Sequence, residues 1–297
     1  MGANHTCVRD HSIAHCWGWN KHGQLGRSEN VGDIPNPTPT LVDDADLGEV
    51  RQLALGYYHS CALRRDGRVL CWGSNFVGQL GTATNVGPGA YTPTPTLVDD
   101  ANLGEVRQLA LGDSHSCVLR QDGRVLCWGR NKFGQLGTTT NEDTETPTPV
   151  PQVVDDADLG EVRQLALGDS HSCALRRDGR VLCWGSNAFG QLGTATNMGH
   201  GAYIRTPTLV NDADLGEVRH LVLGGFHSCV LRQDGRVLCW GRNDSGQLGT
   251  AATAVTGTPT PTLVDDADLS EVQQLALGGF HSCALRQDGR VLCWGRN

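Results

Sequence analysis

The sequence contains no apolar run of the length, about eighteen residues or more, that a membrane-spanning helix needs. Basic residues are scarce too, because 24 Lys and Arg stand against 32 Asp and Glu and leave a net charge of -8. No basic stripe or lysine-rich tail interrupts this acidic background, so the chain offers little to a phosphate backbone. We therefore expect neither membrane insertion nor a nucleic-acid partner.

Helical spacing and common cofactor motifs are also missing. No Cys-x-x-Cys pair supports a zinc site. The recurring Gly-Gln-Leu-Gly of residues 78–81 is followed by neither Lys-Ser nor Lys-Thr, so it predicts a glycine turn with Leu80 in the core and not a phosphate loop. We expect no cofactor and an all-β fold.

The start of the chain lacks the features of a secretory signal. Met1 is followed by Gly2-Ala3-Asn4-His5, with no basic segment and no apolar segment. This start favours the cytosol or a missing leader, whereas the twelve cysteines favour an oxidising compartment.

What the sequence does contain is a tandem repeat. Its core reads L-V-D-D-A-D-L-G-E-V-R-Q-L-A-L-G-x-x-H-S-C-A-L-R-x-D-G-R-V-L-C-W-G-x-N-x-x-G-Q-L-G, and its histidines lie 54 or 56 residues apart. Such a period is typical of propellers and solenoids. We expect one tandem-repeat propeller over 1–297, with a starting hairpin at 1–26 and units at about 27–81, 82–137, 138–193, 194–249 and 250–297.

Each unit holds four short strand candidates separated by Asp, Asn and Gly clusters. In one unit they are Thr96 to Val98, Glu105 to Leu111, His115 to Arg120 and Gly123 to Trp128. Four short strands per unit are the number found in a propeller blade. The fold class is therefore predicted as all-β, a β-propeller of four-stranded antiparallel blades with about five and a half to six repeats.

The hairpin between the third and fourth strands has a register that places its cysteines opposite each other. A loop Arg65-Asp66-Gly67 closed by Arg64 and Arg68 brings Cys61 opposite Cys71 at a non-hydrogen-bonded site, where Cα atoms lie about 4.5 Å apart. In the first copy a shorter loop, His11-Ser12, preserves the pairing of Cys7 with Cys16. We predict the disulfides Cys7–Cys16, Cys61–Cys71, Cys117–Cys127, Cys173–Cys183, Cys229–Cys239 and Cys283–Cys293, with buried thiols of a reduced core as the alternative.

The repeat count leaves ring closure open. The cysteine hairpin occurs six times, whereas the segment from Leu-Val to Leu-Ala-Leu-Gly occurs five times. The two interpretations are a six-blade ring with one incomplete blade and a piece of a longer repeat protein, and we favour the second.

The combination Ala-Leu-Gly-x-x-His-Ser-Cys-Ala-Leu and Cys-Trp-Gly-x-Asn-x-x-Gly-Gln-Leu-Gly resembles the repeat of the regulator of chromosome condensation family over nearly the whole chain. The resemblance implies a propeller, usually of seven blades. Members of the family include a guanine-nucleotide exchange factor on chromatin, a plant ultraviolet-B receptor, ligase-associated domains and a secreted bacterial inhibitor of β-lactamase. Fold alone does not select among these functions.

The residues that the light receptor and the exchange factor use for their functions are absent from this sequence. The light receptor uses tryptophans before its repeat histidine, whereas this chain has Tyr57-Tyr58, Asp113-Ser114, Asp169-Ser170, Gly225-Phe226 and Gly279-Phe280. The exchange factor uses a basic tail and a unit-specific insertion, and the sequence shows neither. We expect neither photoreception nor nuclear exchange activity.

Most residues that suggest chemistry are repeated in every unit, which favours structural roles. The histidines are interpreted as structural hydrogen-bonding groups rather than a metal ring, and the tryptophans Trp17, Trp72, Trp128, Trp184, Trp240 and Trp294 as packing between blades. Serine after histidine, as in His59-Ser60, lacks a unique third partner for catalysis. The acidic loop with Asp43, Asp44, Asp46 and Glu49 does not have the ligand spacing of a calcium loop, so we expect a solvated turn or a negative rim that steers basic partners.

Function is therefore expected in the variable segments of the units. These are polar surface loops, and they contain the candidate binding residues Tyr91, Met198, His200, Tyr203 and Arg205. The leading hypothesis is a non-enzymatic, bacterial, secreted or periplasmic module that binds an unidentified protein partner. The alternatives are a structural repeat segment of a larger surface or secreted protein and, third, a repeat-scaffold enzyme.

Overall fold

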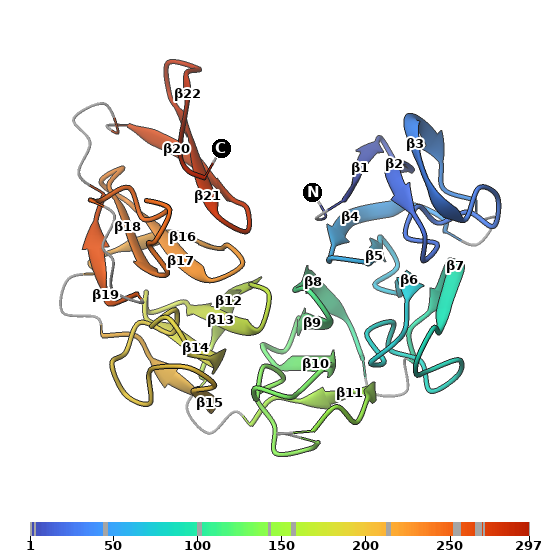
Figure 1. Ribbon diagram of the computed structural model, residues 1–297, viewed down its shortest axis with the longest axis horizontal. Helices are drawn as coiled ribbons and strands as arrows, with labels where there is room; N and C mark the ends of the chain where they lie inside the picture. The colour runs from blue at the N-terminus through green and yellow to red at the C-terminus, as the bar shows by residue number, and fades with distance from the viewer. Residues whose placement is uncertain are drawn as a thin grey trace. The chain divides into compact units, whose positions relative to one another are not determined.

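A computed structural model describes residues 2, 4–43, 47–99, 103–141, 144–155, 159–211, 215–251, 257–264, 269 and 271–296. Its regular elements are antiparallel strands arranged in six sheets, the blades of a β-propeller, as Figure 1 shows. No helix in the described part of the chain is long and apolar enough to cross a membrane. The predicted fold class is confirmed.

Four of the blades have four strands and two have three. Blade 1 is β1 (His5–Asp10), β2 (Ile13–Asn20) and β3 (Gly32–Leu41); blade 2 is β4 (Val50–Leu55), β5 (His59–Arg64), β6 (Val69–Ser74) and β7 (Tyr91–Leu97); blade 3 is β8 (Val106–Leu111), β9 (His115–Arg120), β10 (Val125–Gly129) and β11 (Thr148–Val153). Blade 4 is β12 (Val162–Leu167), β13 (His171–Arg176), β14 (Val181–Ser186) and β15 (Tyr203–Leu209); blade 5 is β16 (Val218–Leu223), β17 (His227–Arg232), β18 (Val237–Gly241) and β19 (Thr258–Leu263); blade 6 is β20 (Val272–Leu277), β21 (His281–Arg286) and β22 (Val291–Gly295).

The cysteine hairpins have the predicted register. Cys61 lies opposite Cys71, the Arg64 amide donates to the Arg68 carbonyl over 2.9 Å, and Gly67 takes the left-handed φ of 86° that the loop requires. The shorter loop of β1 and β2 likewise places Cys7 opposite Cys16. All six predicted disulfides are present with Cα atoms 4.1 Å apart, and the described cysteines include no free thiol.

The fourth strand of a blade is longer than predicted. The sequence predicted it as Thr96 to Val98, the first strand of the unit that continues with Glu105, whereas β7 runs from Tyr91 to Leu97, includes Pro93 and Pro95 and pairs with β6 of the preceding blade. Proline lacks the N–H that a central strand must donate, but the last strand of a sheet has one side without a neighbour and tolerates it. The Thr-Pro alternation is therefore a signal for an edge strand.

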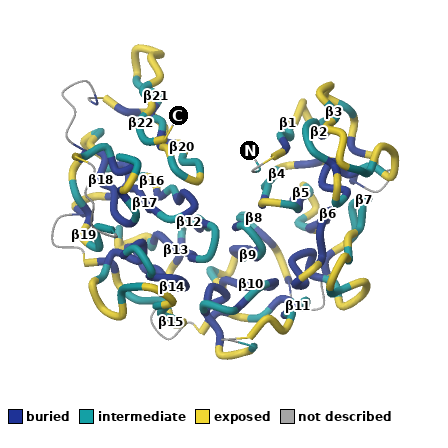
Figure 2. The backbone as a smooth tube through the Cα atoms, in the orientation of Figure 1, coloured by how far each residue is buried: buried dark blue, intermediate teal, exposed yellow. Residues whose placement is uncertain are grey.

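The two middle strands of a complete blade are buried, as Figure 2 shows for β5, β6, β13 and β14. Trp72, Trp128, Trp184 and Trp240 are fully buried, as predicted for packing between blades. Trp17 and Trp294, in the three-stranded blades, are only partly buried. Trp294 still packs against the hydrophobic cluster between blades 5 and 6 and donates to the Gln247 carbonyl, as predicted for packing between blades.

By its internal contacts the chain divides into two compact units. The first comprises residues 1–132 and 138–154 and holds blades 1 to 3, and the second comprises 133–137 and 155–297 and holds blades 4 to 6. The sites below are each described within one unit.

Candidate interaction surface

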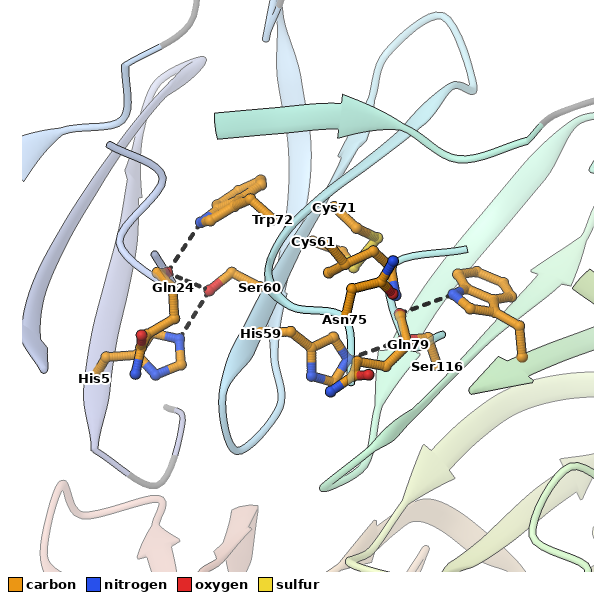
Figure 3. Close-up of a disulfide and its surroundings, with 12 residues drawn as sticks. His5, Gln24, His59, Ser60, Cys61, Cys71, Trp72, Asn75, Gln79 and Ser116 are labelled. Carbon is orange, nitrogen blue, oxygen red and sulfur yellow. Dashed lines mark hydrogen bonds between the residues drawn. A yellow bond between two sulfur atoms is a disulfide. The ribbon is translucent and has the colours of Figure 1, made fainter. Parts of the chain in front are cut away.

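The repeated histidines and serines join neighbouring blades. The Nε2 atom of His59 on β5 lies 2.9 Å from Ser116 Oγ on β9, and the same hydroxyl donates to the backbone carbonyl of Gln79 over 2.9 Å (Figure 3). Because the hydroxyl proton goes to that carbonyl, the histidine must donate its Nε2–H to the serine oxygen. His5 with Ser60, His171 with Ser228 and His227 with Ser282 repeat this contact.

The tryptophans and the glycine turn complete the same joint. The indole Nε1–H of Trp128 also donates to the Gln79 carbonyl, over 2.9 Å, so that one turn accepts two donors from the next blade. Within the turn, Asn75 Oδ1 accepts from the Leu80 amide and Gln79 Oε1 from the Val77 amide. Leu80 is fully buried, as the sequence predicted. The repeated polar residues thus hold the blades together.

Burial keeps four of the repeat histidines neutral. It lowers the pKa of His59, His115 and His227 to about 3 and that of His5 to about 4, with smaller effects from nearby positive charge. The ring of His59 also lies against Gly56, where a Cβ would be 2.2 Å from its Cε1 atom. A neutral ring in a fixed position is a structural donor.

In the part of the chain that the structure describes, no group of three or more His, Cys, Asp or Glu side chains is placed to hold a metal ion. The calcium interpretation of the acidic loop falls partly on Asp44 and Asp46, which lie outside the described residues.

The predicted binding residues are divided between the two compact units. Tyr91 begins β7 in the first unit, whereas Met198, His200, Tyr203 and Arg205 lie on β15 and the loop before it in the second. Tyr91 and Tyr203 hold equivalent places, because each carbonyl accepts a hydrogen bond from an asparagine, Asn85 or Asn197, in a left-handed conformation. His200 and Arg205 are exposed, and Met198 is half-buried. No single cluster within a unit contains all five.

Sequence reasoning missed a cluster of rings around one arginine in the second unit. The guanidinium carbon of Arg242 lies 4.8 Å from the ring centroid of Phe189, 5.6 Å from that of Phe226 and 5.0 Å from that of Phe280. Arg242 also pairs with Asp244 at 2.5 Å, and Arg296 lies 5.8 Å from the Phe280 ring. We call Phe189, Phe226, Phe280, Arg242 and Arg296 the arginine–phenylalanine cluster. Its rings are only half-buried.

The first unit carries a second set of rings, the tyrosine cluster, formed by Trp19, His22, Tyr57 and Tyr58. The centroid of the Tyr58 ring lies 4.4 Å from that of Tyr57, 5.0 Å from that of His22 and 5.6 Å from that of Trp19. Burial raises the pKa of Tyr58, with smaller contributions from Tyr57 and from the Asp113 carboxylate.

Both clusters come from the same positions of the repeat. These are the two residues between the glycine and the histidine, such as Tyr57-Tyr58 and Gly225-Phe226, and the residues just after Trp-Gly, such as Arg242. The positions vary while their neighbours repeat, which is the signal that could have found them. Of these positions, only the two residues before the histidine were considered above, as places for the tryptophans of a light receptor.

Comparison with known proteins agrees with this architecture. A model of the RCC1-like domain family matches residues 1–297. The probable E3 ubiquitin-protein ligase HERC6 of Homo sapiens is 32% identical over 303 residues, which cover 99% of this chain and 28% of HERC6. The guanine nucleotide exchange factor SRM1 of Saccharomyces cerevisiae is 28% identical over 337 residues, which cover 99% of this chain and 68% of SRM1. The chain therefore spans well under half of HERC6.

A solved structure shows the same fold. The crystal structure of Prp20p from Saccharomyces cerevisiae matches with a TM-score of 0.85 at 28% identity, over 99% of this chain and 70% of that chain. With its repeat motifs, its six blades of antiparallel strands and a family match over its whole length, the chain belongs to the RCC1-like domain family.

Proposed function

We propose that this chain is a non-catalytic protein-binding propeller and that the arginine–phenylalanine cluster is its main recognition surface. The observation that carries the proposal is Arg242, which contacts three phenylalanine rings from three repeats although no repeat motif requires it. Side chains conserved by the repeat join blades, whereas these side chains remain half-exposed. Arginine and large aromatic residues are the types that dominate binding energy at protein interfaces.

The contacts of Arg242 also suit it to a partner. The guanidinium stacks on rings and pairs with Asp244, so it is held in one orientation before binding. A side chain that is already ordered loses little conformational entropy when it is buried. Its side chain is 26% exposed, which leaves an edge of the guanidinium for a partner's acceptor groups.

Relatives support a protein as the partner class. The crystal structure of Prp20p is described with its binding to Gsp1p and histones, and yeast RCC1 (Prp20) was crystallised with Kap60. More than half of the 32 acidic residues lie in the repeated acidic loops, a charge that favours a basic partner. We include the loop residues Tyr91, Met198, His200, Tyr203 and Arg205 as secondary contacts.

The six disulfides support placement in an oxidising compartment, since such bonds persist outside the reducing cytosol. The secreted, bacterial assignment stays a prediction, because the relatives described above come from human and yeast.

The test is quantitative capture of partner proteins by the immobilised chain and two variants. F226A/F280A removes two rings of the cluster, and F76A removes a ring that is 48% exposed on blade 2 as a matched control. We expect the proteins held by the wild type and by F76A to be lost from F226A/F280A while the variant keeps its circular dichroism spectrum. Equal capture by all three chains would assign recognition elsewhere and favour the structural-repeat alternative.

A further inference from the structure

At two joints between blades, a glutamine on the first strand of one blade hydrogen-bonds to the backbone of the first strand of the next blade. Gln52 Nε2 donates to the Leu109 carbonyl over 2.8 Å, and Gln52 Oε1 accepts from the Leu109 amide over 3.1 Å. In the second unit Gln164 makes the same two bonds to Leu221, at 2.8 and 3.1 Å. One carboxamide thus satisfies one backbone donor and one backbone acceptor on an edge strand.

At the joint between blades 5 and 6 this glutamine is replaced. The position is occupied by His220 on β16, and the residue that it would cover is Leu275 on β20. Leu275 lies opposite Ala284 in the same register that places Leu221 opposite Val230, so its N–H and C=O point away from the neighbouring strand β21. Among the described residues, no hydrogen bond joins His220 to Leu275, whereas the equivalent Leu109 and Leu221 are both covered.

A second contact is missing at the same joint. Arg163 Nη2 donates to the Val218 carbonyl at 2.5 Å, and Arg51 makes the equivalent contact with Val106 at 3.1 Å. Arg219 stands at this position on β16, and within the described part of the chain it makes no corresponding hydrogen bond to β20. Arg219 and His220 occupy the positions whose side chains bridge blades 2 and 3 and blades 4 and 5, and among the described residues neither makes the equivalent hydrogen bond to β20.

The joint opens into a polar cleft. It has a volume of about 640 Å³ and is lined by Arg219, His220 and Leu275 together with the glutamines Gln164, Gln273 and Gln287. This volume falls within the range of small-ligand sites, about 300–1,000 Å³. Burial and the charges of Arg219 and Arg163 lower the pKa of His220, so its ring is neutral at neutral pH and offers one donor and one acceptor.

The hydrogen-bonding pattern selects the ligand. A carboxylate has no donor for the Leu275 carbonyl, and a guanidinium has no acceptor for the Leu275 amide. A primary carboxamide has both, in the arrangement that Gln52 and Gln164 already show on equivalent backbone. We propose that the cleft at His220 binds a primary carboxamide, that of a glutamine or asparagine side chain. The bound carboxamide would make the two hydrogen bonds to Leu275 that Gln52 and Gln164 make to Leu109 and Leu221.

The binding test uses the whole chain and saturation-transfer difference NMR. The probe is N-acetyl-L-glutamine N-methylamide, the comparator is the methionine analogue of similar length without a carboxamide, and free L-glutamine is the third arm. We expect saturation of the glutamine probe by the wild type and at least a five-fold smaller signal with H220Q, because the new glutamine would itself cover Leu275. Q52H should gain signal, since it uncovers the equivalent backbone at Leu109 and Gln52 does not line the cleft at His220.

Hydrogen exchange measured by mass spectrometry gives an independent readout. The peptide of residues 272–280 has a unique sequence, and its exchange should slow with the probe or, without the probe, in H220Q. The peptide of residues 50–58 is also unique, lies in the other compact unit and contains no residue substituted in H220Q, so its exchange should not change. No saturation of the glutamine probe, equal saturation of the methionine analogue, or an unchanged signal in H220Q would each overturn the proposal.

Saturation of free glutamine as well would identify a small molecule as the ligand, whereas saturation of the blocked probe alone would identify a polypeptide side chain. The site shares no residue with the arginine–phenylalanine cluster, so either proposal can fail alone.

Discussion

His59 donates from Nε2 to Ser116 Oγ across 2.9 Å, although the two residues are 57 positions apart. Ser116 passes its own proton to the Gln79 carbonyl, which also accepts the indole N–H of Trp128. One hydroxyl therefore connects the strand of one blade with the strand and turn that pack against it. This contact explains why histidine, serine, glutamine and tryptophan recur together in the repeat.

Removal of the bridging hydroxyl should destabilise the fold. Ser116→Ala would leave the buried His59 N–H and one bond to the Gln79 carbonyl unmade, at a cost of about 2 kcal/mol in the free energy of unfolding. Urea denaturation followed by tryptophan fluorescence measures this cost. Ser28→Ala, at an exposed position, is the control and should leave the midpoint unchanged. Equal midpoints for the two variants would contradict a bridging role.

Stability should decrease in mild acid. Four repeat histidines, His5, His59, His115 and His227, have a pKa of about 3 to 4 when folded and near 6.5 when unfolded, so below pH 6.5 the unfolded chain binds more protons. Each such histidine then lowers the free energy of unfolding by up to about 1.4 kcal/mol per pH unit as the pH falls toward the folded value, and has no such effect above pH 6.5. Urea midpoints at pH 7.5 and pH 5.5 measure the effect.

The exposed His11 supplies the control for the acid experiment. His11→Ala should keep the full pH dependence, since this side chain is 93% exposed and joins no blades. A flat pH profile in the wild type would show that the repeat histidines are not buried in the neutral form.

The cysteines should be oxidised in the isolated protein. Each pair closes a hairpin of nine or ten residues that is already held in register, so the bonds form without rearrangement of the strands. Thiol titration of the unfolded, unreduced protein should detect close to none of the twelve cysteines. Detection of close to twelve would rule out an oxidising compartment.

The glycine before the histidine should tolerate no side chain. In Gly56→Ala the new Cβ would lie 2.2 Å from His59 Cε1 and 2.7 Å from the Gly112 carbonyl oxygen. We expect a loss of roughly 2–4 kcal/mol in the free energy of unfolding, because His59 must leave Ser116 to make room. Gly32→Ala is the matched control, since a Cβ at residue 32 would have no atom within 4 Å and the φ of Gly32 is not positive. A thermal melt of both variants distinguishes the two positions.

Local contacts were the easiest to predict. Hairpin register depends on a loop of two or three residues, so Gly67 and the flanking arginines sufficed to place Cys61 opposite Cys71. The fourth strand was predicted too short, because Pro93 and Pro95 argue against a central strand and their place at the edge of a sheet is not visible in a single unit.

The candidate sites were the hardest to predict. Tyr91 and Arg205 were selected for their exposed, variable loops, whereas the ring cluster around Arg242 draws on single variable positions inside the otherwise repeated motif. The histidine that replaces glutamine at residue 220 is visible in the sequence. Its effect, a backbone segment left without its side-chain hydrogen bonds, follows only from the contacts of Gln52 and Gln164 with the next blade.

The sequence by itself determined the repeat, the antiparallel blades, the hairpin register and the six cysteine pairs. Each of these depends on residues within one sequence repeat and on the two-residue period of a strand. Only the tertiary structure decided which repeat each side chain meets. His59 reaches Ser116, Arg242 lies among rings from three repeats, and Leu275 lacks the clamp that covers Leu109. Contacts between blades follow from how sheets pack face to face, and packing depends on the shapes of both surfaces rather than on the spacing of residues along either one.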